Sequence, residues 1–123
     1  MKQVLQLEEV AITAVACYFL SEHLLGMAVG WWVLLFFAPD ISMLGYAINP
    51  QVGAISYNLF HHRGLALLLT ASGAWWSIEP LLATGILLFA HASFDRIWGY
   101  GLKYFKGFGY THLGQVGKHA QTA

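Results

Sequence analysis

His91 and Asp95 are the residues of this chain whose types and spacing best suit chemistry. They stand four positions apart, where a long apolar run comes to its end. Residues four apart lie on one face of a helix, so an imidazole and a carboxylate at this spacing can reach the same proton or metal ion. A charged side chain at the edge of a hydrophobic segment is costly unless it has a partner or a function. The pair therefore marks a candidate site.

Two further apolar segments also have a polar side chain beside one of their ends. Asp40 follows Pro39 after one segment, and His61 precedes another. Together with the first pair, these residues would offer two imidazole nitrogens and two carboxylate oxygens, a mixed set that suits zinc, manganese or iron. The sequence thus predicts a divalent transition metal such as zinc, held by Asp40, His61, His91 and Asp95, with Asp40 and Asp95 as the candidate catalytic residues.

A second group of residues is predicted to support this site, namely Asn58, His62, Arg63, Tyr100 and His112. Asn58 comes three positions before His61, so we expect it to act as a weak ligand or to orient that imidazole. On a helix His62 points about 100° away from His61, so only one of the two is expected to share the site. The residues alone leave open which one faces the other helices.

Other roles for the same polar residues stay open. Asp95 and Arg63 could form an interhelical ion pair within a purely structural polar network. His61 and His91 could instead ligate a haem iron from two helices, although no attachment motif is present. Five further polar residues are expected to be solvated helix ends, namely Glu8, Glu9, Glu22, His23 and Glu79.

The elements that position these residues are predicted to be membrane helices. Apolar residues make up 58% of the 123 residues and charged residues only 10%, whereas a soluble domain carries roughly 25% charged residues. We expect an all-α transmembrane bundle of about four helices, covering residues 5–21, 24–39, 51–78 and 80–104. The strictly apolar stretches are shorter than the ~20 residues needed to cross a bilayer, so the helices must extend into polar residues. The whole chain, 1–123, is expected to be one integral membrane domain.

Charge placement predicts the orientation of these helices. With four spans, all six Lys and Arg residues lie on one side, and the opposite loops carry none. The positive-inside rule makes that side cytoplasmic, together with both termini and the polar cluster. The formal net charge is zero and no basic run is present, so nucleic acid is not an expected partner.

The segment after the fourth helix has its own pattern. Residues 99–114 alternate glycine with aromatic residues and end in a Thr-His pair, which favours a tight loop over a helix. This cytoplasmic tail could fold back over the polar cluster and bring Tyr100, Thr111 or His112 beside it, or could lie on the lipid surface. The polar end, 115–123, is expected to be disordered.

Several of these motifs occur in one combination that covers nearly the whole chain. They are Pro39-Asp40-Ile41-Ser42-Met43-Leu44-Gly45-Tyr46, Tyr57-Asn58 with His61, His91 with Asp95-Arg96, Gly99-Tyr100-Gly101-Leu102-Lys103-Tyr104, and Thr111-His112-Leu113-Gly114. The combination resembles a bacterial family of short integral membrane proteins classed only as a domain of unknown function, of the 4260 type. The resemblance implies a four-helix, multi-pass protein of the bacterial inner membrane and brings no established activity.

A second, weaker resemblance concerns the order of the polar motifs. Pro39-Asp40, then His62-Arg63-Gly64, then His91 and Asp95 followed by glycine is similar to the pattern of bacterial membrane-bound metal-dependent hydrolases. It implies that Asp40, His61 or His62, His91 and Asp95 are metal ligands.

Two functions therefore stay open. One is hydrolysis of a lipid or phosphoester by a metal-bound water. The other is a non-catalytic membrane module in which the cluster is an interhelical polar network, within a homo-oligomer or beside a partner membrane protein.

Overall fold

The computed structural model describes residues 1–105 and 107–115, and these are predominantly helical. The elements in chain order are α1 (Lys2–Ser21), α2 (Val29–Phe37), the 3-10 helix η1 (Ala38–Ala47), α3 (Pro50–His61), α4 (Arg63–Trp75), α5 (Glu79–Ile97), β1 (Tyr110–Thr111) and β2 (Gly114–Gln115). The two short strands pair antiparallel, with Thr111 opposite Gly114. The predicted all-α class is confirmed.

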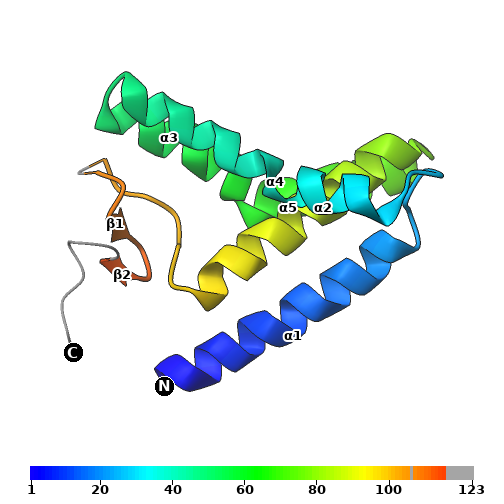
Figure 1. Ribbon diagram of the computed structural model, residues 1–123, viewed down its shortest axis with the longest axis horizontal. Coiled ribbons are helices and arrows are strands. Elements are labelled where there is room, and N and C mark those ends of the chain that lie inside the picture. The colour runs from blue at the N-terminus through cyan, green and yellow to red at the C-terminus, as the bar shows by residue number, and fades with distance from the viewer. Residues whose placement is uncertain (106, 116–123) are drawn as a thin grey trace.

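Helix α5 is the central element, and α1 and α4 pack along it (Figure 1). The α4–α5 hairpin is close-packed because two glycines remove side chains from the contact. A Cβ on Gly73 would collide with the backbone of Leu82, and one on Gly85 would collide with Thr70. Small residues of this kind let helix backbones approach closely. The contact orients the face of α5 that carries His91.

Side-chain contacts tie α1 to α5 at both ends and show that the two helices run antiparallel. At one end the imidazole of His23 lies 2.9 Å from the carboxylate of Glu79. At the other end the Gln6 amide donates to the carbonyl of Ile97 at 3.0 Å. Between the helices, Leu20, Trp32, Ala83, Ile86 and Leu87 form an apolar core.

The helix predicted over 51–78 is two helices, which corrects the sequence-based expectation. The chain breaks at His62, whose ψ of 111° is extended, and the imidazole of His62 accepts a hydrogen bond from the Leu65 N–H at 3.2 Å, capping α4. Helix α3 has its own start, because Asn49 accepts from the Val52 N–H at 2.8 Å and Pro50 occupies its first position. The break ends α3 at His61.

The second and fourth predicted helices also have different bounds. The predicted helix 24–39 starts only at Val29, because Leu25 and Gly26 adopt positive φ, and from Ala38 it continues as η1. The predicted helix 80–104 ends at Ile97, and Gly99 follows with φ of 88°. Glycine tolerates this left-handed conformation, which ends helices.

The chain after α5 folds back across α3 rather than continuing away from it. The side-chain amide of Asn58 makes both hydrogen bonds to the backbone of Lys103. Its Nδ2 donates to the Lys103 carbonyl at 2.8 Å, and its Oδ1 accepts from the Lys103 N–H at 2.5 Å. Lys103 also pairs with Thr111 in an antiparallel bridge next to β1. The end predicted to be disordered is 115–123; its first residue, Gln115, instead lies in β2 and pairs with Tyr110, and residues 116–123 lie outside the described part of the chain.

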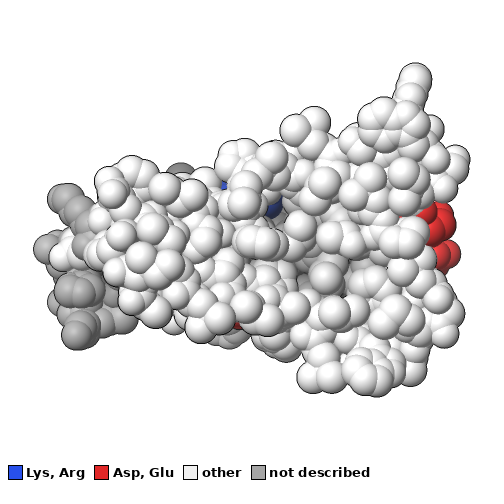
Figure 2. All heavy atoms as spheres, turned by 90° about the horizontal axis from the view of Figure 1, so that it is seen from above, with Lys and Arg blue, Asp and Glu red and all other residues white. Residues whose placement is uncertain are grey.

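Much of the described surface is apolar. Lys2–Ser21 and Val29–Ala47 are long and apolar enough to cross a membrane by length and composition, and only 17% and 11% of these stretches are buried. The core helix of a soluble protein would be mostly buried. The face in Figure 2 shows very few Lys, Arg, Asp or Glu side chains, and acidic ones gather at one end.

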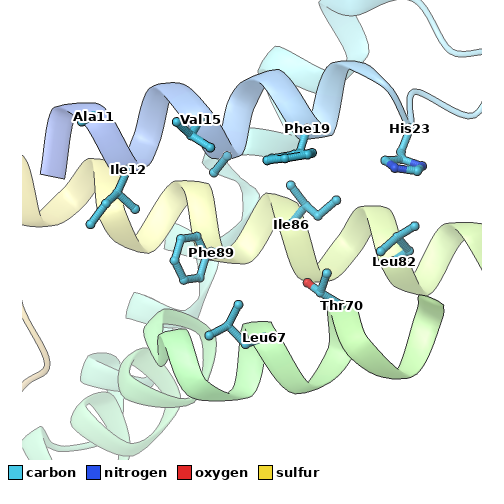
Figure 3. A pocket seen from close by; sticks show the side chains of 11 residues that line it. Ala11, Ile12, Val15, Phe19, His23, Leu67, Thr70, Leu82, Ile86 and Phe89 are labelled. Atoms are coloured by element: carbon cyan, nitrogen blue, oxygen red, sulfur yellow. The ribbon is translucent and has the colours of Figure 1, made fainter. Parts of the chain in front are cut away.

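A broad groove runs between α1 and α4 over α5 (Figure 3). It has a volume of about 570 Å³, and its walls include Ile12, Phe19, Leu67, Ile86 and Phe89. The lining is almost wholly apolar, and it lies away from the polar cluster described next.

Candidate metal centre

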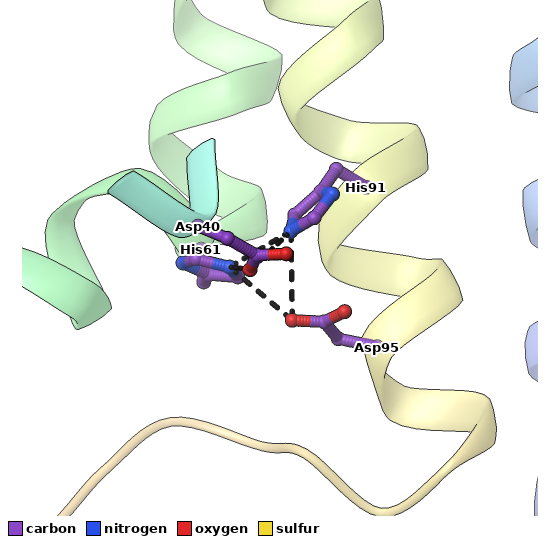
Figure 4. Close-up of side chains that lie close together, drawn as sticks. All are labelled: Asp40, His61, His91 and Asp95. Carbon is purple, nitrogen blue, oxygen red and sulfur yellow. Dashed lines mark hydrogen bonds and ion pairs between the residues drawn. The ribbon is translucent and has the colours of Figure 1, made fainter. Parts of the chain in front are cut away.

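Four side chains from three elements converge beside α5. Asp40 lies near the start of η1, directly after the buried Pro39, and His61 is the last residue of α3. His91 and Asp95 lie one turn apart on α5. Figure 4 shows all four side chains pointing toward one another. The structure therefore brings together the four residues predicted as ligands.

The spacing of their ligand atoms suits a metal ion. Nε2 of His91 lies 3.0 Å from Nε2 of His61 and 3.1 Å from Oδ1 of Asp40. Oδ2 of Asp95 lies 3.2 Å from Nε2 of His61 and 3.5 Å from Nε2 of His91. All four ligand atoms fall within 4.8 Å of one another. Tetrahedral zinc with bonds of about 2.0–2.1 Å has ligands about 3.3 Å apart, so the cluster has the dimensions of a metal site.

Burial differs across the cluster and gives it an open side. The side chains of His61 and His91 are 3% and 0% exposed, and that of Asp95 is 13% exposed. The side chain of Asp40 is 39% exposed. A small molecule would therefore approach the cluster from the side of Asp40.

The hydrogen bond of His61 sets the proton on its ring. Nδ1 of His61 lies 2.8 Å from the carbonyl oxygen of Tyr57. A carbonyl only accepts, so Nδ1 carries the proton and donates it, which leaves a lone pair on Nε2. This is the arrangement seen in metal-binding histidines, whose second nitrogen is held by a carbonyl or carboxylate.

Tyr57 is a site residue that the sequence interpretation missed. Its hydroxyl donates to Oδ2 of Asp95 at 2.9 Å, and its ring stacks on His61 with 3.8 Å between centroids and 6° between planes. The side chain is 1% exposed. The signal for it was its position one helical turn before His61, which places both rings on one face of α3.

Of the five predicted supporting residues, only Tyr100 lies at the site. It lines a cavity of about 210 Å³ together with Asp40, Met43, Tyr57, Asp95 and Phe108. Asn58 binds the backbone of Lys103 instead of orienting His61. His62 is exposed and caps α4, so His61 is the member of the pair that faces the cluster. His112 accepts from the Leu102 N–H at 2.8 Å and holds the tail loop together.

Arg63 makes a different ion pair from the one considered for it. Its guanidinium donates to Glu9 of α1 at 2.8 Å and to the hydroxyl of Ser93 at 3.3 Å. The expectation that Glu9 is a solvated helix end is therefore wrong, because its side chain is only 14% exposed. With Arg63 engaged by Glu9, the carboxylate of Asp95 faces the two imidazoles.

The geometry also argues against the haem alternative. Axial histidines bind iron from opposite faces of the porphyrin, with the macrocycle between them. The two Nε2 atoms here are only 3.0 Å apart, which leaves no space for a macrocycle.

Comparison with known proteins gives one finding. No curated protein and no solved structure matches the chain. The family model described as Domain of unknown function (DUF4260) matches residues 2–116. Because the match covers nearly the whole chain, the protein belongs to this family of unknown function, as the combination of motifs predicted.

Proposed function

We propose that the protein is a multi-pass membrane protein with a divalent metal centre near the cytoplasmic membrane face, which hydrolyses a lipid or another phosphoester. The single observation that carries the proposal is the cluster of two imidazoles and two carboxylates, whose N–N and N–O distances are 3.0–3.5 Å. Nitrogen and oxygen donors in this ratio suit zinc, manganese or iron.

The membrane part of the proposal rests on the exposed apolar surface and on charge placement. Trp75 is 82% exposed, and Leu7 and Leu34 are 69% and 66% exposed. In water such side chains would be unfavourable, whereas lipid tails solvate them. Four spans, α1, α2 with the start of η1, α4 and α5, put Lys2, Arg63, Arg96 and Lys103 toward the proposed cytoplasmic face, with Arg63 at the first position of α4.

The hydrolytic chemistry follows from the open side of the cluster. A metal held by Asp40, His61, His91 and Asp95 would supply Lewis-acid chemistry, which activates a water for attack on the phosphorus or carbonyl carbon of the ester. Asp40 is the half-exposed ligand at the cavity and would accept the proton from that water. The leaving alcohol would take the proton back as its bond to phosphorus or carbon breaks.

Metal analysis tests the first step. Detergent-purified protein is expected to carry about one transition metal per chain by elemental analysis, and His91→Ala is expected to lose it, because the variant removes a fully buried ligand. His62→Asn is the matched control, because it changes the neighbouring exposed histidine and keeps an N-cap acceptor for α4. Equal metal content in wild type and His91→Ala would overturn the metal centre.

Hydrolysis needs its own test. Metal-loaded protein is expected to release product from mixed micelles of phosphodiester or carboxyl-ester lipids, and Asp40→Asn is expected to lower kcat by about a hundredfold or more, because it removes the proposed proton acceptor. An unchanged kcat for Asp40→Asn would exclude this role for Asp40.

A second candidate function is a non-catalytic membrane module. The observation in its favour is that members of the cluster can also hydrogen-bond to one another, since a proton on Nε2 of His91 can be donated to Asp40 at 3.1 Å. This alternative predicts that a chelator leaves the melting temperature unchanged, whereas loss of a metal bound by four ligands would lower it.

A further inference from the structure

Lys103 is a buried charged residue that the proposed reaction does not use. Its side chain is only 4% exposed, and within the described residues its ammonium nitrogen has no hydrogen-bond partner. Three aromatic rings surround it. Nζ lies 3.9 Å from the ring centre of Phe108, 4.7 Å from that of Tyr57 and 5.3 Å from that of Tyr100.

The backbone of Lys103 is held in place from both sides. The Asn58 amide makes two hydrogen bonds to it, one to the carbonyl and one from the N–H. Thr111 pairs with it in the antiparallel bridge. These contacts fix the backbone of Lys103, and the surrounding rings bury its side chain.

The three rings that enclose the ammonium also line the cavity beside the metal ligands. Tyr57, Tyr100 and Phe108 form part of its wall, and Asp40 and Asp95 form another part. The cavity volume of about 210 Å³ can hold a phosphate group. The ammonium thus lies against three rings of the cavity wall, and the two carboxylates of the cluster belong to the same wall.

A buried ammonium without an acceptor is energetically unfavourable, and cation–π contacts recover only part of the cost. Burial lowers the pKa of Lys103 to about 8, and the negative charge of Asp95 limits the decrease. At neutral pH the group is therefore mainly charged. Its three N–H donors have no acceptor among the described residues, so an anionic oxygen that reaches the ammonium past the rings of the cavity wall would accept from them.

We propose that Lys103 is the anion-binding residue of this cavity and that the ligand it selects is a phosphate group, held between the ammonium and the metal cluster. The inference rests on the proposed function, which places the reaction at the metal cluster. It limits the proposed substrates to phosphate esters and leaves out carboxyl esters. Phosphate oxygens come from a lipid headgroup or from a soluble phosphate, and the two sources share this chemistry.

The test is calorimetric titration of detergent-solubilised protein with inorganic phosphate and, separately, with dihexanoyl phosphatidic acid. Each titration is made with metal-free and cobalt-loaded protein. Lys103→Met is expected to raise the dissociation constant about tenfold or more, because it removes a charge-assisted contact and keeps an unbranched, apolar side chain of nearly the same length. Lys2→Met is the matched control, since it removes an equal charge from an exposed position, and its dissociation constant is expected to equal that of the wild type.

The outcomes separate this inference from the metal proposal. Binding that is equal in Lys103→Met and wild type, or absent from the wild type in both metal states, overturns the role of Lys103. A wild type that binds phosphate through Lys103 but takes up no cobalt overturns the metal centre alone. Binding of phosphatidic acid without inorganic phosphate identifies the lipid as the source. Lys103→Gln repeats the test if the Met variant does not fold, as judged by circular dichroism.

Discussion

At the scale of the residue, the cluster depends on side chains that hold its ligands in place. Asp95 receives a hydrogen bond from Tyr57, and the same tyrosine stacks on His61 while its backbone carbonyl accepts from that imidazole. One residue thus positions two of the proposed metal ligands, His61 and Asp95, which come from different helices. Such supporting contacts usually change metal affinity by about ten- to a hundredfold when they are removed.

Tyr57→Phe removes the hydroxyl and keeps the ring. We expect this variant to bind zinc or cobalt about tenfold more weakly, because Asp95 loses its partner while the stack on His61 remains. Competition with a chromogenic chelator measures the change. Tyr46→Phe is the control, because the buried hydroxyl of Tyr46 has no hydrogen-bond partner in the described part of the chain. Equal losses of affinity in both variants would contradict a specific role for Tyr57.

At the scale of the element, the site depends on the close packing of α4 on α5 and on the break at His62. The break lets α3 turn away from α4, so that its last residue, His61, faces α5. If α3 and α4 were one unbroken helix, α3 would lie along the axis of α4 and could not turn away from it. The contact at Gly73 and Gly85 sets how closely α5 approaches α4.

Gly73→Ala is expected to lower the free energy of unfolding by about 1–3 kcal/mol, because the new methyl group would overlap the backbone of Leu82. Thermal melts of the detergent-solubilised protein measure the effect. Gly30→Ala is the matched control, since it lies in α2 and no described atom outside its own helix stands within 4 Å of the added carbon. Alanine there should leave stability equal or slightly higher, by its helix propensity. Equal melting temperatures for both variants would contradict the close contact.

At the scale of the whole molecule, different elements form the two ends. One end holds the α1–α2 connection and the α4–α5 turn, with Glu79 paired to His23, and the apolar core lies near it (Figure 1). The other end holds the start of α1 and the tail hairpin. The proposed topology makes the second end cytoplasmic.

Single cysteines test this topology in a Cys17→Ser background, because Cys17 is the only cysteine of the chain. In spheroplasts, Glu22→Cys should react with a membrane-impermeant maleimide, and Lys2→Cys should react only after permeabilisation. Both positions are exposed, so the membrane alone would cause the difference. Labelling of both cysteines in intact spheroplasts, or of Lys2→Cys alone, would contradict the four-span arrangement.

The helical class and the four residues of the cluster could be read from the sequence because they depend on local features. Apolar content, helical spacing of His91 and Asp95, and polar residues at segment ends are all properties of neighbours along the chain. The bounds of the helices were harder to predict from the sequence. The cap by the His62 ring and the positive φ of Leu25 are set by single side chains and turns that an apolar pattern does not register.

The sequence by itself determined which residue types are present, that the chain is helical and apolar, and that it belongs to a family recognisable from its motifs. Only the tertiary structure decided which polar groups pair with one another. Arg63 binds Glu9 across 54 positions of the chain, Asn58 binds Lys103 across 45, and Tyr57 binds Asp95 across 38. The physical reason is that helical periodicity sets the face on which a side chain lies, whereas its partner depends on how separate helices and the tail pack together.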